Sequence, residues 1–247
     1  MLLEMLLEML KSTFKRNLQD FKEIFNKPKL YDYQLPKYLQ FRYTFLPIFI
    51  LIVLVYYYVD ASVESYIKHA PSNDIFMIFD VLTHVGESKY IIVLCSIIVF
   101  VRLFTDVKMK SHKYISFLNK ISTYAGFVLF SVSFSGVLGQ ILKFIIGRAR
   151  PKFFLEYGSH YFQHFHSPGY DFASMPSGHS ITIGAMFIAF LYIFPKARYL
   201  WYLLIVILAG SRVIVGAHYP SDVIFGVVIG GYSSAYVYYW MKNRSII

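Results

Sequence analysis

The sequence predicts an all-α fold, a polytopic membrane helical bundle with six transmembrane helices and an N-terminal amphipathic helix. Of its 247 residues, 57% are hydrophobic and 19% aromatic, whereas only 15% are charged. An average soluble domain carries about 25% charged residues. Long apolar runs alternate with short polar segments, which is the pattern of a chain that crosses a bilayer several times.

The first 25 residues predict an amphipathic helix that lies on the membrane. Apolar residues recur there at helical spacing, interrupted by charged residues such as Glu4, Glu8 and Lys15. The stretch has neither the uninterrupted apolar core nor the cleavage site of a signal peptide. A disordered or oligomer-contacting tail is the alternative. We therefore expect a cytoplasmic N-terminal segment, residues 1–42, and a transmembrane domain, residues 43–242.

Six apolar runs follow, each assigned to one transmembrane helix: 43–59, 90–104, 121–142, 180–194, 199–211 and 223–241. Several are shorter than the ~20 residues that a span needs, so their helices must extend into the flanking segments. Segment 75–85 fits either an interfacial helix or the beginning of the second span. The single cysteine, Cys95, excludes intramolecular disulfides and predicts a packing residue in the second span. Glycines in the third and sixth spans predict close helix packing: Gly126, Gly136, Gly139, Gly226, Gly230 and Gly231.

The positions of the basic residues predict the orientation. Of 24 Lys and Arg residues, 17 lie in four segments: eight in 1–42, five in 102–120, two in 195–198 and two in the C-terminal tail. Because cytoplasmic loops are enriched in Lys and Arg, both termini are expected in the cytoplasm and the protein in the inner membrane. The net charge of +10 then reflects the orientation in the membrane and an affinity for anionic lipid head groups. The sequence has no basic stripe of the kind that binds nucleic acid, so no nucleic-acid partner is expected.

Three short motifs fall on the opposite, periplasmic side: KFIIGRARP at 143–151, PSGH at 176–179 and SRVIVGAHYPSD at 211–222. If the helix of the first motif runs unbroken to Pro151, Lys143 and Arg150 project from one face, since they are two turns apart. PSGH precedes an apolar run, so the amides of Ser177 and Gly178 are expected to open toward an anion at a helix N-terminus.

The third motif predicts a histidine at the beginning of another helix. Pro220 favours the first helical turn, where its missing N–H has no cost. His218 would therefore lie just outside a helix N-terminus, with Asp222 one turn into the helix. A phosphate group would fit beside both predicted helix ends.

These segments resemble the three signature motifs of the type 2 phosphatidic acid phosphatase superfamily, K-x6-RP, PSGH and SR-x5-H-x3-D. With the helices that carry them they cover about residues 121–240. The resemblance implies a membrane phosphatase in which His218 is the nucleophile and forms a phosphohistidine, Asp222 accepts a hydrogen bond from its other nitrogen, and His179 is the general acid. It implies phosphate binding by Lys143, Arg150, Ser177, Gly178 and Arg212.

The motifs leave the substrate open, because members of this family act on lipid A, undecaprenyl pyrophosphate, phosphatidylglycerophosphate and phosphatidic acid. The loop at 152–175 is long and rich in aromatic residues and histidines, which suggests a bulky head group and favours lipid A 1-phosphate. Phosphotransfer to an acceptor hydroxyl is a related possibility. The expected partner is a membrane lipid, whereas the oligomeric state stays open.

Two other classes of protein are alternatives. A metal hydrolase would use His160, His164, His166 and Asp171 with His179 or His218. Three permanent cations beside one motif carboxylate repel a divalent ion, so no metal and no cofactor is expected. A transporter or lipid-binding protein would keep its polar residues near the bilayer midplane on broken helices, whereas here they cluster at helix ends on one side.

Overall fold

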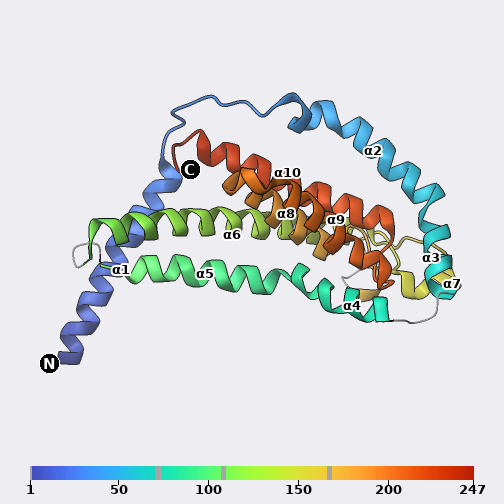
Figure 1. Cartoon of the computed structure of the whole chain (residues 1–247), viewed down its shortest axis with the longest axis horizontal. Helices are drawn as coiled ribbons and strands as arrows, with labels where there is room; N and C mark the ends of the chain where they lie inside the picture. The colour runs from blue at the N-terminus through green and yellow to red at the C-terminus, as the bar shows by residue number, and fades with distance from the viewer. Residues whose placement is uncertain (1, 70–73, 107–109, 166–168) are drawn as a thin grey trace.

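The computed structural model describes residues 2–69, 74–106, 110–165 and 169–247, and these form helices and loops without strands. Figure 1 shows the helices gathered along one long axis. Their bounds are α1 Leu2–Asn26, α2 Phe41–Tyr58, α3 Asp60–His69, α4 Asp74–Thr83, α5 Ser88–Phe104, α6 His112–Ile146, α7 Phe154–Tyr157, α8 Gly178–Ile193, α9 Arg198–Ile214 and α10 Pro220–Lys242.

Each predicted apolar run corresponds to one helix, in chain order α2, α5, α6, α8, α9 and α10, although Val59 and Phe194 lie one residue past the ends of α2 and α8. Among the described residues, three helical segments are long and apolar enough to cross a membrane, namely Phe41–Tyr58, His112–Ile146 and Pro195–Ile214. The count of six spans therefore stays a prediction, whereas the all-α membrane bundle is confirmed. Segment 75–85 forms the separate helix α4 and a 3₁₀ turn, His84–Gly86, before α5 begins.

α6 is the longest helix, and it ends earlier than the sequence predicted. Its 35 residues measure about 50 Å, more than the hydrocarbon core requires. Gly147 closes the helix at φ 60°, and a Cβ there would lie 1.7 Å from the carbonyl oxygen of Gln163. The helix therefore does not run unbroken to Pro151, and the prediction that Lys143 and Arg150 share one helical face is wrong.

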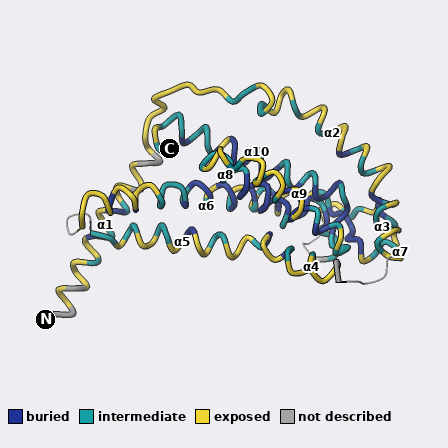
Figure 2. Tube along the Cα trace, viewed as in Figure 1, coloured by how far each residue is buried: buried dark blue, intermediate teal, exposed yellow. Residues whose placement is uncertain are grey.

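The core forms around α8, which packs against α6, α9 and α10. Buried residues gather in that part of the bundle in Figure 2, while α2 and α5 are largely exposed. A Cβ on Gly226 or Gly230 would lie 2.6 Å or 2.1 Å from a carbonyl oxygen of the α8 segment, so α10 approaches α8 backbone to backbone. Gly139 of α6 likewise leaves no room for a Cβ, which would be 2.4 Å from Ile181.

The packing prediction fails at two other glycines of α6. A Cβ on Gly126 or Gly136 would meet nothing within 4 Å. Gly231 of α10 allows an ordinary contact at 3.5 Å. Small residues in a span therefore marked close helix packing at only half of the predicted positions. Cys95, by contrast, is buried in α5 as expected, at 4% exposure.

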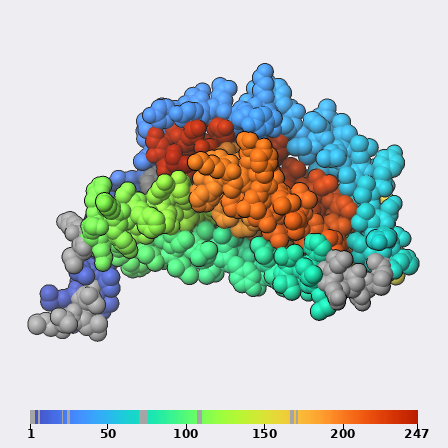
Figure 3. All heavy atoms as spheres, in the orientation of Figure 1, coloured from blue at the N-terminus to red at the C-terminus, as the bar shows by residue number. Residues whose placement is uncertain are grey.

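The N-terminal stretch is the predicted helix, α1, and it projects from one end of the bundle (Figures 1 and 3). It packs on the C-terminal end of α5, where Phe14 stacks on Phe104 with ring centroids 5.0 Å apart. The amide of Asn17 donates to the carbonyl of Leu103 at 2.8 Å, an otherwise unsatisfied group at the helix end. α1 thus contacts the transmembrane bundle, and its position on the membrane surface stays a prediction.

Candidate active site

The N-terminus of α8 carries the PSGH motif and is fixed to α10. Ser177 is the N-cap of α8, and its hydroxyl accepts from the amide and the hydroxyl of Ser180 at 3.4 and 2.9 Å. Its own amide donates to the carbonyl of Asp222 at 3.0 Å. The Ser177 amide is therefore used inside the protein, contrary to the expectation that it opens toward an anion. Gly178 begins the helix beside Lys143, whose Cε would lie 3.8 Å from a Cβ at this glycine.

The first motif continues from α6 into a loop that folds back over the helix end. Lys143 is 6% exposed, and its ammonium donates to the carbonyl of Ala173 at 2.5 Å. After Gly147 the backbone pairs with a later part of the loop, where the amide of Ala149 donates to the backbone carbonyl of Tyr161 at 3.0 Å. Arg150 is 8% exposed, and its amide donates to the carbonyl of Asp171 at 3.0 Å. The loop thus holds Arg150 near Lys143 although the helix does not.

The third motif places its histidine between two helices. α9 ends at Ile214, and α10 begins at Pro220 as predicted. The amide of His218 donates to the carbonyl of Arg212 at 3.2 Å, so the turn fixes these two residues relative to each other. Arg212 donates to the hydroxyl of Thr83 at 2.6 Å, which ties α9 to α4.

Asp222 is fully buried and bound by three donors. Its carboxylate accepts from Arg148 at 2.6 Å, from the hydroxyl of Ser174 at 2.6 Å and from the amide of Tyr219 at 3.1 Å. Nδ1 of His218 lies 3.7 Å from Oδ2 of Asp222, which exceeds a hydrogen bond. The carboxylate faces the ring as expected, but the predicted hydrogen bond is absent from this geometry.

Burial sets the protonation state of His218. The residue is 2% exposed, and removal from water lowers its pKa to about 3, against the opposing effect of the Asp222 carboxylate. The cations Arg150 and Lys143 act in the same direction as burial. The imidazole is therefore neutral near pH 7 and keeps a lone pair for nucleophilic attack.

The three motifs meet at one end of the bundle. The charges of Arg212, Arg150 and Lys143 all act on His179, and those of Arg150 and Lys143 act on His218. Three cations thus act on the imidazole at the N-terminus of α8, where the charge of Glu87 opposes them, and two of the cations act on the imidazole just before α10. Such a cluster favours an anion with several oxygens, because both the helix ends and the side chains carry positive charge.

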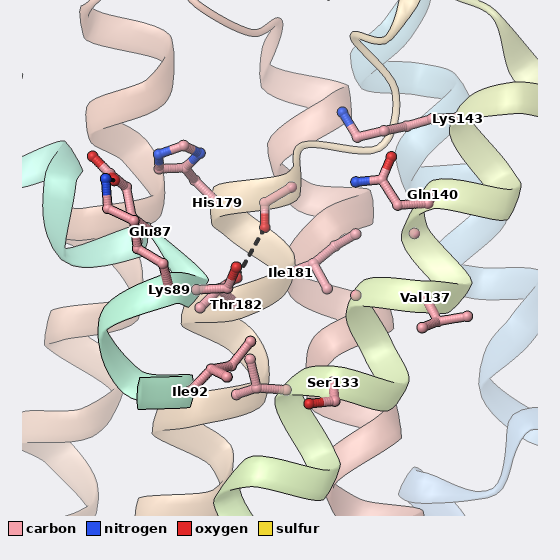
Figure 4. A pocket seen from close by; sticks show the side chains of 16 residues that line it. Glu87, Lys89, Ile92, Ser133, Val137, Gln140, Lys143, His179, Ile181 and Thr182 are labelled. Atoms are coloured by element: carbon pink, nitrogen blue, oxygen red, sulfur yellow. Dashed lines mark hydrogen bonds and ion pairs between the residues drawn. The ribbon is translucent and has the colours of Figure 1, made fainter. Parts of the chain in front are cut away.

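An open pocket of about 600 Å³ leads to this cluster between α5, α6 and α8. Lys143 and His179 lie at its upper end in Figure 4, which also shows side chains of α5 and α6 on either side of it, and Gly178 is a further lining residue. The lower end is lined by apolar residues including Ile92 and Val137. A ligand with a polar group and an apolar chain fits this order of residues.

Comparison with known proteins agrees with the motif geometry. The model of the PAP2 superfamily matches residues 124–246, which contain all three motifs. The chain belongs to the PAP2 superfamily. It is 40% identical over 156 residues to a lipid A 1-phosphatase from Rhizobium etli, covering 63% of this chain and 66% of that protein. The same identity over 158 residues relates it to a lipid A 1-phosphatase from Rhizobium johnstonii, with 63% of each chain covered.

The alignments thus span slightly less than two thirds of these relatives' length. Among solved structures, the chain resembles a transmembrane PAP2-type phosphatidylglycerophosphate phosphatase from Bacillus subtilis, with a TM-score of 0.56. At 21% identity, over 80% of this chain and 94% of that one, this likeness supports the PAP2 fold.

Two charged residues that hold Asp222 in place, Arg148 directly and Asp60 through Arg148, were not predicted from the sequence. Arg148 lies within the first motif and is 0% exposed; it binds Asp222 and, at 2.8 Å, Asp60 at the beginning of α3. Asp60 is also 0% exposed and lies outside the matched segment. The carboxylate of Asp60 directly after the apolar run 43–59 could have indicated a functional residue, but no local pattern shows that its partner is Arg148.

The two loop histidines that the structure describes, His160 and His164, each contact a backbone carbonyl. Nε2 of His160 lies 3.0 Å from the carbonyl of Tyr56, and Nδ1 of His164 lies 3.2 Å from that of Ile145. Asp171 forms an ion pair with Lys152, and His166 lies outside the described residues. In the part of the chain that the structure describes, no three His, Cys, Asp or Glu side chains are close enough to bind one ion.

Proposed function

We propose that this protein is an integral membrane lipid phosphatase that hydrolyses a lipid phosphate monoester or pyrophosphate through a phosphohistidine. The observation that carries the proposal is the cluster of three cations and two histidines, two of which, Lys143 and His179, line one end of an amphipathic pocket. Phosphoryl transfer requires an in-line nucleophile, a proton for the leaving oxygen and positive charge around the equatorial oxygens. The cluster contains a candidate for each role.

In the first step the phosphoryl group is transferred to His218. Because Nδ1 faces Asp222, the free Nε2 attacks phosphorus, and the bond from phosphorus to the lipid oxygen breaks with both electrons moving to that oxygen. His179, in its protonated form, donates a proton to the leaving oxygen. Asp222 stabilises the positive charge that develops on the ring of His218.

In the second step water attacks the phosphohistidine. The neutral His179 accepts a proton from the water as its oxygen bonds to phosphorus, and the bond to Nε2 breaks. Inorganic phosphate leaves, and both histidines return to their starting states. The phosphoryl oxygens are bound by Lys143, Arg150, Arg212 and the Gly178 amide, and by Ser177 through the proton of its hydroxyl.

This chemistry requires no metal or cofactor, since the three permanent cations provide the positive charge that a metal supplies in other phosphatases. We favour lipid A 1-phosphate as the substrate, in keeping with the two rhizobial relatives. Undecaprenyl pyrophosphate, phosphatidylglycerophosphate and transfer to an acceptor hydroxyl are the alternatives. The distribution of basic residues supports a site on the periplasmic side of the inner membrane, with residues 1–42 as a cytoplasmic segment and 43–242 as the catalytic domain.

The test is phosphate release by detergent-solubilised protein in the presence of EDTA. The substrates are lipid A, undecaprenyl pyrophosphate, phosphatidylglycerophosphate and phosphatidic acid, and the control is His218→Ala. We expect release that EDTA leaves intact, that vanadate inhibits and that His218→Ala abolishes without unfolding the protein. Activity that survives in the variant would remove His218 as the nucleophile, and activity that depends on an added divalent ion would restore the metal hydrolase.

A further inference from the structure

The pocket is larger than its phosphate end requires. Its volume of about 600 Å³ is in the range of pockets that bind whole small molecules, whereas the three motifs account only for one phosphoryl group. Four polar side chains line the pocket close to its phosphate end, and we call them the head-group belt: Glu87 just before α5, Lys89 in α5, Gln140 in α6 and Thr182 in α8. None of these residues belongs to the three motifs, although the charge of Glu87 acts on His179.

Gln140 is the informative member of the belt. It lies three residues before Lys143 on α6, so both side chains project toward the pocket, as Figure 4 shows. Its side chain is exposed and has no hydrogen-bond partner among the residues that the structure describes. A primary amide on the membrane-facing side of a spanning helix is costly unless it is hydrogen-bonded. A polar group of the bound lipid can provide that partner.

The wall of the pocket at the beginning of α5, formed by Glu87 and Lys89, carries little net positive charge. Glu87 contacts both Lys89 and His84, one through each carboxylate oxygen. Hydrogen bonds from Lys89 and then His84 lower the pKa of Glu87 to about 2, so it is ionised and offsets the charge of Lys89. This wall is therefore poorly suited to a second phosphate. Carboxylate oxygens retain further acceptor sites and suit hydroxyl donors.

The third face of the belt is Thr182 on α8. Its hydroxyl donates to the carbonyl of Gly178 at 3.3 Å, which leaves its oxygen as an acceptor directed at the pocket it lines. The belt thus contains an amide that can donate and accept, from Gln140, a carboxylate, from Glu87, and a hydroxyl oxygen, from Thr182. That combination matches several hydroxyl groups on one ring better than a prenyl chain, which has no hydrogen-bonding atoms.

We propose that Gln140 and Glu87 form a subsite for the hydroxyl groups of a glycosyl head group, so that the substrate is a glycolipid phosphate. The sugar ring lies between α5 and α6 with its phosphate at Lys143 and His179, and its acyl chains pass Ile92 and Val137. This assignment rests on the proposed phosphatase function and gives the favoured class of substrate a binding subsite. It separates a sugar phosphate from prenyl phosphates, which would leave the amide of Gln140 unpaired.

The experiment compares Gln140→Leu with the parent protein on two substrates in the same micelles, an acylated glucosamine 1-phosphate and farnesyl phosphate. Leucine keeps a similar volume but removes the amide. We expect the ratio of kcat/KM for the sugar substrate to that for farnesyl phosphate to fall about tenfold, the effect of one lost hydrogen bond. Glu87→Gln should lower the same ratio. Ile141→Leu is the matched control, because Ile141 is exposed next to Gln140 but does not line the pocket.

The outcomes separate the subsite from the phosphatase itself. An unchanged ratio in Gln140→Leu, with both substrates hydrolysed and an unaltered Tm, would overturn the subsite and leave the phosphatase intact. A parent protein that prefers farnesyl phosphate would also overturn the subsite. If the protein hydrolyses neither substrate and no lipid of the wider panel, the proposed phosphatase activity and the subsite are both overturned.

Discussion

Asp60 and Asp222 share one guanidinium, that of Arg148, which lies 2.8 Å from the first carboxylate and 2.6 Å from the second. All three side chains have no solvent exposure. Asp60 also accepts from the amide of Ser221 at 2.9 Å, so it caps the N-terminus of α10 from a different helix. The position of Asp222 beside His218 therefore depends on α3 as well as on the motif itself.

Arg148→Met should be strongly destabilising, because it leaves two buried carboxylates without their shared cation. Removal of one partner of a buried ion pair costs about 3–5 kcal/mol. The same substitution in an Asp60→Asn background should cost less, since only Asp222 is then left unpaired. Thermal unfolding of the two single variants and the double variant in detergent measures the coupling. Strictly additive losses would show that Asp60 and Asp222 do not depend on the same guanidinium.

His179→Ala should affect substrates according to their leaving group. A lipid alkoxide needs a proton as it leaves, so we expect kcat to fall about 10²- to 10⁴-fold. With p-nitrophenyl phosphate, whose phenolate leaves without protonation, the loss should be much smaller. Steady-state kinetics on both substrates measures the difference. Equal losses on the two substrates would rule against His179 as the general acid and favour a role in phosphate binding.

Glu64 should make stability depend on pH. It lies one turn after Asp60 in α3, its side chain is 2% exposed, and Lys68 is 3.8 Å away. Burial raises its pKa from 4.5 to about 7, and Lys68 opposes this shift. Since the folded-state pKa is above the unfolded one, its contribution is fully present below pH 4.5 and is lost as pH rises through 7.

Glu64→Gln removes this titration and should therefore raise Tm relative to the parent protein above pH 7. The difference should diminish toward pH 4.5, and the shift bounds it at about 3 kcal/mol. Thermal unfolding of both proteins across this pH range is the measurement. Parallel curves at all pH values would mean that Glu64 does not change its protonation state on folding.

Gly230→Ala should separate α8 from α10, and Gly126→Ala is the matched control. A Cβ at Gly230 would lie 2.1 Å from the carbonyl oxygen of Ile181 and 2.6 Å from the amide nitrogen of Ala185, so backbone must move. We expect a loss of about 1–3 kcal/mol and lower activity, because the same helices position His179 and Asp222. A Cβ at Gly126 meets nothing within 4 Å, so its Tm should stay unchanged or rise slightly. A similar Tm for both variants would contradict the close helix contact.

Sequence reasoning succeeded where the signal was local. Apolar runs marked the helices, Pro220 marked the beginning of α10, and the motifs marked the cations that gather near His179 and His218. It failed where an unbroken helix was assumed between Lys143 and Arg150, because Gly147 ends α6 and the loop brings Arg150 back. It also assigned His218 a hydrogen bond to Asp222, whereas the carboxylate is bound by three other donors.

By itself the sequence determined the class of fold, the family and the three motifs whose charged side chains gather at one end of the bundle, since composition, periodicity and motif spacing are properties of short segments. Only the tertiary structure decided that Asp60 and Arg148 hold Asp222, that Gln140 faces the pocket, and that Gly230 but not Gly126 lies at a helix contact. These are relations between residues far apart in the chain. They depend on how helices pack and on which buried charges must meet, and no local pattern encodes either one.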